Sequence, residues 1–215
     1  MALTGINIEE AKASINNVVS SYGDIETALI STSVSNLVAP MSSLWGSPEA
    51  VDFFEKYQTS IDSLMSSIGT TFESVVNSMN SAASSLASIG GETWGNVPIS
   101  IAHDKVDVSA IKKDLNGVVG VDVIIASSTA NAAMSTIKIQ ISRALTEACN
   151  AVNASGFVGG GMQESLVSSL KSIETNVEDA FDQLSKDIKE AIAATEETYN
   201  QTASNVESAF GGSGS

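Results

Sequence analysis

The chain has 215 residues, of which 43% are hydrophobic, and it carries 25 acidic residues against 10 lysines and arginines, a formal net charge of −15. The apolar content is enough for a buried core, so a disordered chain is excluded. The negative charge would repel a nucleic-acid backbone, which excludes nucleic acid as a partner, and it disfavours binding to an anionic membrane.

Long helices are favoured because only three prolines occur and 5% of the residues are aromatic. The first residues, MALTGINIEEAKAS, have neither a basic start nor an apolar core of signal-peptide length, so classical signal-directed export is not expected. The longest apolar run, Val118–Ala126, is too short to span a bilayer. Cys149 has no cysteine to pair with and is expected to be a small buried apolar residue.

The first predicted helix runs from Ile8 to about Leu37. Asn7 is expected to cap it, with Glu10 three positions later, and Pro40 is expected to end it. Apolar or small residues recur at intervals of three and four, which predicts one buried stripe. The stripe comprises Ala11, Ile15, Val18, Tyr22, Ile25 and Leu29.

A break follows in the stretch SLWGSPEAVDFF, which places Trp45 between two Ser- and Asn-rich segments. An indole is costly to leave in water, so this tryptophan is expected to mark a corner where neighbouring elements meet. Ser47 and Pro48 are typical of the cap and first position of a second helix, which would be about 60 Å long. Its stripe comprises Phe54, Tyr57, Ile61, Leu64, Ile68, Phe72, Val75, Met79, Ala82 and Leu86.

Glycines, Trp94 and Pro98 predict an irregular connector over residues 89–105. Beyond it, VDVSAIKKDLNGVV (Val106–Val119) echoes INIEEAKASINNVV (Ile6–Val19) at an offset of 100, with four identical residues, which predicts an internal repeat. The segment Val118–Ser127 is β-branched and contains a glycine, so helix and strand both stay open there.

The second half repeats the helical spacing twice, and the two stripes are separated by SGFVGGG at residues 155–161. The first comprises Ile137, Ile141, Leu145, Ala148 and Val152, and the second comprises Leu166, Leu170, Ile173, Val177, Phe181, Leu184, Ile188, Ile192, Thr195, Tyr199 and Val206. The sequence therefore predicts an all-α protein of two tandem antiparallel helical hairpins in an elongated four-helix bundle. The expected divisions are a hairpin at 1–88, the connector at 89–105, a degenerate hairpin at 106–210 and a flexible tail or linker, GGSGS, at 211–215.

The Trp-Gly corner and the helix that opens SPEAVDFFEKY resemble the small Trp-X-Gly (WXG) proteins of type VII secretion, which are helical hairpins that pair into four-helix bundles. Two hairpins in one chain are similar to tandem WXG proteins and, more loosely, to LXG domains. Trp45-Gly46-Ser47 has a serine where the family has glycine, and Phe157-Val158-Gly159 keeps the glycine without the tryptophan. The family's export signal, a tyrosine with an acidic residue four positions later, is not present at Tyr199, which Ala203 follows.

The resemblance implies a non-enzymatic bacterial protein that acts through helix–helix contacts, as a secretion substrate or as a targeting chaperone. It would be cytoplasmic before export, and export without a cleaved signal peptide stays open. The implied partner is another WXG- or LXG-like protein, the secretion machinery or a second copy of the chain. Trp45 and Gly46, Phe157 and Gly159, and Trp94 are the candidate turn and interaction residues, with packing inside the chain as the alternative for each aromatic.

No catalytic, cofactor-binding or metal-binding set of residues is predicted. His103 is the only histidine and has no cysteine or second histidine near it, and GFVGGG lacks the Lys-Ser/Thr ending of a phosphate loop. Two alternatives from other classes stay open. One is an α-helical pore-forming toxin component that uses the apolar patch at 118–127, and the other is a helical filament subunit.

Overall fold

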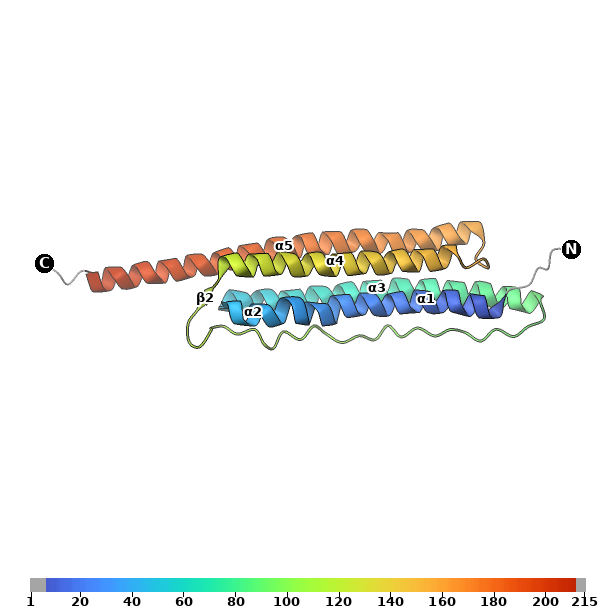
Figure 1. Cartoon of the computed structure of the whole chain (residues 1–215), viewed down its shortest axis with the longest axis horizontal. Coiled ribbons are helices and arrows are strands. Elements are labelled where there is room, and N and C mark those ends of the chain that lie inside the picture. The colour runs from blue at the N-terminus through green and yellow to red at the C-terminus, as the bar shows by residue number, and fades with distance from the viewer. Residues whose placement is uncertain (1–6, 212–215) are drawn as a thin grey trace. The chain divides into compact units, whose positions relative to one another are not determined.

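The computed structural model describes residues 7–211, and these residues are mostly helical (Figure 1). The helices are α1 (Ile8–Glu26), the π-helical turns η1 (Thr27–Ser31) and η2 (Val34–Val38), α2 (Ala39–Leu44), α3 (Pro48–Ile89), α4 (Val123–Asn153) and α5 (Gly160–Gly211). Two strands of two residues, β1 (Trp45–Gly46) and β2 (Gly120–Val121), pair antiparallel. The all-α prediction is confirmed, while the predicted GGSGS linker lies almost wholly outside the described residues.

The chain folds into two compact units, and each unit takes its residues from three stretches. The first unit contains the described residues of 1–29 together with 62–104 and 138–179. The second unit contains 30–61, 105–137 and the described residues of 180–215. The predicted boundaries at 88 and 105 divide the chain in sequence, and these units cut across that division.

The predicted stripes are the buried faces of the helices. All six residues of the first predicted stripe are buried, five on α1 and Leu29 on η1, as are the five of α4 and the nine of α5 from Leu166 to Thr195. The α3 stripe is buried from Phe54 to Met79 and then moves by one position, to Ala83 and Ala87. Burial of an amphipathic face is the main source of helix stability, so the spacing of three and four correctly located the core. Cys149 is free and buried as predicted, and this burial raises the pKa of its thiol.

Asn7 caps α1 as predicted, because its Oδ1 accepts a hydrogen bond from the backbone N–H of Glu10 at 3.3 Å. The predicted end before Pro40 is wrong. The two π-helical turns follow α1, and Pro40 lies at the start of α2, where a helix needs no proline N–H. In the wider turn, Ala39 donates its N–H to Val34 O, five residues back.

Residues 106–119 contain no helix, so the predicted repeat of the α1 start is wrong. Asn116 and Gly117 have positive φ values of 56° and 84°, and Leu115 and Val118 exchange both backbone hydrogen bonds across them. This geometry is a tight β-hairpin turn, which Asn-Gly strongly favours. At the offset of 100, Gly117 replaces Asn17, and a glycine adopts the left-handed conformation at no steric cost. The non-helical connector therefore extends to Asp122, and Val118–Ser127 divides into bridge, strand and helix.

The α5 stripe does not stay buried to its predicted end. Thr195 is fully buried, whereas the side chains of Tyr199 and Val206 are 54% and 51% exposed. The two residues keep the predicted spacing, but no element of the described chain covers them. The spacing of a stripe predicts which face is apolar and does not predict how far a partner element reaches.

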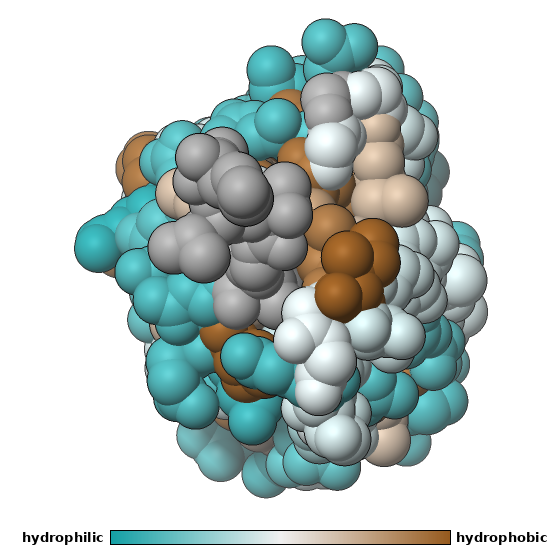
Figure 2. Space-filling view, turned by 90° about the vertical axis from the view of Figure 1, so that its right-hand side faces the viewer, coloured by the Kyte–Doolittle hydropathy of each residue, from teal (hydrophilic) through white to brown (hydrophobic). Residues whose placement is uncertain are grey.

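Figure 2 shows one face of the molecule, on which hydrophilic residues predominate and hydrophobic residues gather near the centre of the view. No helix among the described residues has a segment apolar and long enough to cross a bilayer.

Candidate functional site

The tryptophan corner lies in the second unit, between the end of α2 and the start of α3. Trp45 is fully buried and pairs with Val121 in the short sheet, while Gly46 pairs with Gly120. The indole Nε1–H donates to Thr195 Oγ1 at 3.0 Å. A corner residue is thereby tied to α5, 150 residues away in the sequence.

Ser47 caps α3 and joins the same hydrogen-bond network. Its Oγ accepts the backbone N–H of Ala50 at 3.0 Å and lies 2.9 Å from Thr195 Oγ1. Thr195 also donates to Ala191 O at 3.0 Å. Both hydroxyls are therefore engaged inside the protein, and the serine that follows Trp45-Gly46 acts as a helix cap.

An aromatic cluster surrounds the indole. Trp45 lies 6.1 Å from Phe53 and 6.2 Å from Phe54 between ring centroids, and both phenylalanines contact Tyr57. Tyr57 Oη and Ser33 Oγ are 2.7 Å apart in the core. Burial raises the pKa of Tyr57, so its hydroxyl stays neutral. Packing inside the chain, the alternative to a partner at Trp45, is what the structure shows.

Position 46 requires a glycine because another stretch of backbone, at Asp114 and Leu115, lies close to it. A Cβ built there would lie 2.6 Å from the carbonyl carbon of Asp114 and 2.7 Å from the backbone nitrogen of Leu115. Non-bonded atoms cannot occupy such distances, so only glycine fits beside the hairpin turn. The sequence predicted the corner at Trp45-Gly46, but it did not predict that Asp114 and Leu115 pack on it.

The other candidate residues belong to the first unit. Phe157 is buried in the turn between α4 and α5, and a Cβ on Gly159 would meet nothing within 4 Å. Packing within the chain therefore holds for Phe157 as well, and Gly159 is not required by a close contact. Trp94 is partly buried, and its Nε1–H donates to Asn80 Oδ1 at 3.1 Å.

Sequence reasoning missed the role of Asn80, which holds the connector on α3. Its Nδ2 donates to Val97 O at 2.8 Å, and its Oδ1 accepts from Val97 N at 2.9 Å. The side-chain amide thus satisfies both backbone groups of Val97, as a neighbouring strand would. An asparagine on the apolar face of a helix was the available signal, since a buried amide needs partners.

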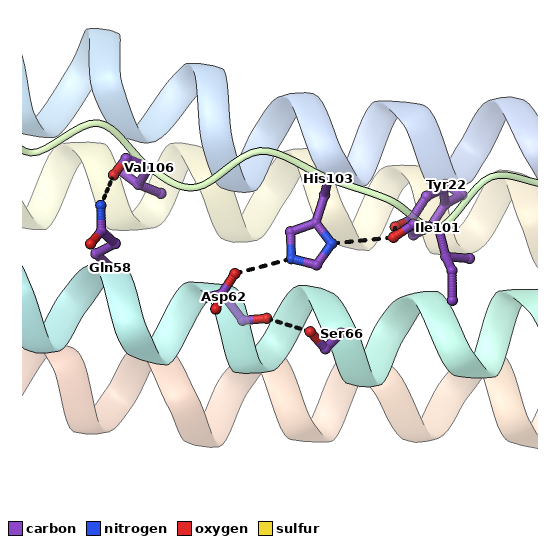
Figure 3. Close-up of polar contacts among 7 residues, drawn as sticks. All are labelled: Tyr22, Gln58, Asp62, Ser66, Ile101, His103 and Val106. Atoms are coloured by element: carbon purple, nitrogen blue, oxygen red, sulfur yellow. Dashed lines mark hydrogen bonds and ion pairs between the residues drawn. The ribbon is translucent and has the colours of Figure 1, made fainter.

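Further contacts hold the connector in each unit (Figure 3). In the first unit, Tyr22 Oη donates to Ile101 O at 3.3 Å, and Ile101 packs over Gly69, where a Cβ would lie 3.1 Å from it. In the second unit, Gln58 Nε2 donates to Val106 O, and Val106 is buried. The connector, residues 90–122, is therefore ordered along α3, and we call it the strap.

Removing the Asn80 amide should release part of this strap. With Asn80→Ala, the two backbone groups of Val97 lose their partners, and we expect local stability to fall by about 1–2 kcal/mol. Thermolysin should then cleave residues 92–104 faster than in the parent chain. Asn77→Ala, at an exposed position of the same helix, is the matched control and should leave the cleavage rate unchanged. Equal cleavage of both variants would contradict the role of Asn80.

His103 lies on the strap with one acidic partner. Its Nε2 is 3.3 Å from Asp62 Oδ1, and its Nδ1 is 3.2 Å from Ile101 O (Figure 3). Among the described residues, no group of three or more histidine, cysteine, aspartate or glutamate side chains could hold a metal ion. The arrangement around His103 is that of a contact between strap and helix.

The chain matches no family model, no curated protein and no solved structure.

Proposed function

We propose that this chain is a non-enzymatic interaction protein of the WXG kind, a substrate or targeting chaperone of a type VII-like secretion system in a bacterium. The observation that carries the proposal is the corner itself. Trp45-Gly46 lies where one long helical segment ends and α3 begins, and the indole is buried in an aromatic cluster. A Trp-Gly turn between two helical arms is the feature on which the resemblance rests.

The proposal includes the helical arrangement. The segment from α1 to α2 and α3 would form one hairpin, and α4 and α5 would form the second. Each of these helices has one buried apolar stripe, and two hairpins can bury such stripes against each other as a four-helix bundle. A single chain would then take the place of the dimer that two single hairpins form.

A binding role is favoured over catalysis by what the polar side chains do. The hydroxyls of Ser47 and Thr195 bond to each other and to backbone groups, so neither is poised as a nucleophile. Exposed apolar residues on α4 and α5, among them Ile124 and Tyr199, are available for a partner helix.

The test is size-exclusion chromatography with light scattering on the purified chain, alone and after co-expression with the adjacent genes of its locus. We expect a monomer of 22.1 kDa that forms a complex of defined stoichiometry with a neighbouring gene product. A ring or polymer of the chain alone, with no complex, would overturn the proposal.

One observation favours a second candidate, a pore-forming or self-assembling protein. Val118, beside the Asn116-Gly117 turn, and Ile124 and Ile125, at the start of α4, are exposed in the patch that suggested membrane entry. This candidate requires dye leakage from liposomes at micromolar protein, or polymers that grow with concentration. If the protein binds neither neutral nor anionic vesicles, the pore-forming candidate is excluded.

A further inference from the structure

The last part of α5 has no packing partner in the described chain. Among the α5 residues whose burial is described, Thr195 is the last buried one, and every residue from 196 to 208 is exposed although all of them are helical. A helix of this length is marginal in water unless a buried face stabilises it. The end of α5 is thus a helix whose stability calls for a contact that the described residues do not provide.

This helix carries an apolar stripe. Tyr199 and Val206 are seven residues apart, so they lie on one face two turns from each other. Two large apolar side chains at this spacing are the a or d positions of a short coiled coil. The exposed face is therefore shaped for another helix.

More apolar side chains are exposed at the same end of the second unit. Trp45 bonds to Thr195 and pairs with Val121, which places the end of β2 beside the last buried turn of α5. Tyr199 follows Thr195 by one helical turn. The exposed residues on either side of β2 are Val118, Val119, Ile124 and Ile125. Together with Tyr199 and Val206 they form what we call the terminal surface.

The charge on the α5 part of this surface selects the partner. No lysine or arginine follows Lys189, whereas Glu196, Glu197 and Glu207 lie on the exposed helix. Acidic flanks favour a partner helix whose flanking positions are basic. The same charge repels a second copy of this chain and an anionic membrane.

We propose that the terminal surface binds an amphipathic helix of another protein, one with an apolar stripe flanked by lysine or arginine. This deepens the proposed function, since it names the surface and the chemistry of the partner. Binding would cover Tyr199 and Val206 and would stabilise the helix from residue 196 onward.

The probe is a synthetic three-heptad peptide with leucine at a and d and lysine at e and g, and its control carries glutamate at e and g. Fluorescence anisotropy at physiological ionic strength should show binding of the basic peptide only. The double variant Tyr199→Ser/Val206→Ser keeps the charge of the chain and should weaken binding by at least about tenfold. Ile139→Ser, which changes a 66% exposed residue of the first unit, should leave binding unchanged.

Amide hydrogen exchange gives a second readout. Residues 196–208 should exchange fast in the free chain and slowly with the basic peptide, because docking buries one face of the helix. Circular dichroism of the variants should match the parent chain, since all three substitutions are at exposed positions.

Each other outcome counts against the terminal surface. Absence of peptide binding, equal binding by the double variant, or a matching loss with Ile139→Ser would overturn the proposal. So would vesicle binding or self-association that the double variant abolishes. If a co-expressed complex forms and tolerates the double variant, the proposed function is upheld and this surface is rejected. If the peptide binds and the double variant weakens that binding, but no complex forms on co-expression, this surface is upheld and the proposed function is rejected.

Discussion

Replacing Trp45 with alanine is expected to lower the free energy of unfolding by about 3–5 kcal/mol, the range for a fully buried aromatic side chain. The indole is 0% exposed, contacts Phe53 and Phe54, and donates a hydrogen bond to Thr195. Alanine would leave a cavity and would remove the bond that ties the corner to α5. Urea unfolding followed by circular dichroism measures the change, and the midpoint of thermal unfolding should fall by about 10 °C.

The second tryptophan is the matched control. Trp94 is only partly buried, so Trp94→Ala should cost clearly less than Trp45→Ala. If the complex of the proposed function depends on the corner, Trp45→Ala should also weaken it, whereas Trp94→Ala should not. Equal stability of the parent chain and the Trp45→Ala variant would refute the structural role of the corner.

The core of each helix could be predicted because the stripes are periodic. Buried residues on α1, α4 and most of α5 are those that recur at three and four. The cap at Asn7 and the start of α3 at Ser47 were predictable for a similar reason, since capping depends on the residues of one helical turn. Patterns that involve residues close in the sequence therefore predicted the helices and their caps correctly.

Two of the wrong predictions, the helix end at Pro40 and the repeat at residues 106–119, failed for different reasons. Pro40 does begin a helix, but two π-helical turns replace the expected break, and nothing in the local pattern announces them. The Asn116-Gly117 turn did have a signal, because Asn-Gly between apolar residues favours a hairpin. The echo of the N-terminal segment favoured helix instead, although Gly117, which replaces Asn17 at the offset of 100, is what allows the turn.

The candidate site was predictable only in part. Sequence alone placed Trp45 at a corner and Thr195 in a buried stripe, but it could not predict the hydrogen bond between them, because that contact depends on how α5 packs in the second unit. The same holds for Asn80, whose partner is backbone of the strap. Long-range contacts of this kind leave no spacing pattern in the chain.

Gly46→Ala is expected to destabilise the protein by about 3 kcal/mol, at the upper end of the usual cost of overpacking. The new methyl group would meet the backbone at Asp114 and Leu115 at 2.6 and 2.7 Å. Backbone cannot rotate away as a flexible side chain can, so the hairpin turn must move off the corner. Loss of the β1–β2 pairing should follow, and denaturant unfolding together with faster amide exchange at Val121 would report it.

Gly120 provides the matched control because it is the cross-strand partner of Gly46. A Cβ at Gly120 meets nothing within 4 Å, and its backbone is not in the left-handed region. Gly120→Ala should therefore leave stability unchanged or raise it by up to about 1 kcal/mol, since alanine reduces the entropy of the unfolded chain. Opposite effects at two paired glycines would locate the constraint in the packing of the strap against the corner. Similar effects at both positions would place it in the strand pairing instead, and Gly46 would then have no special role.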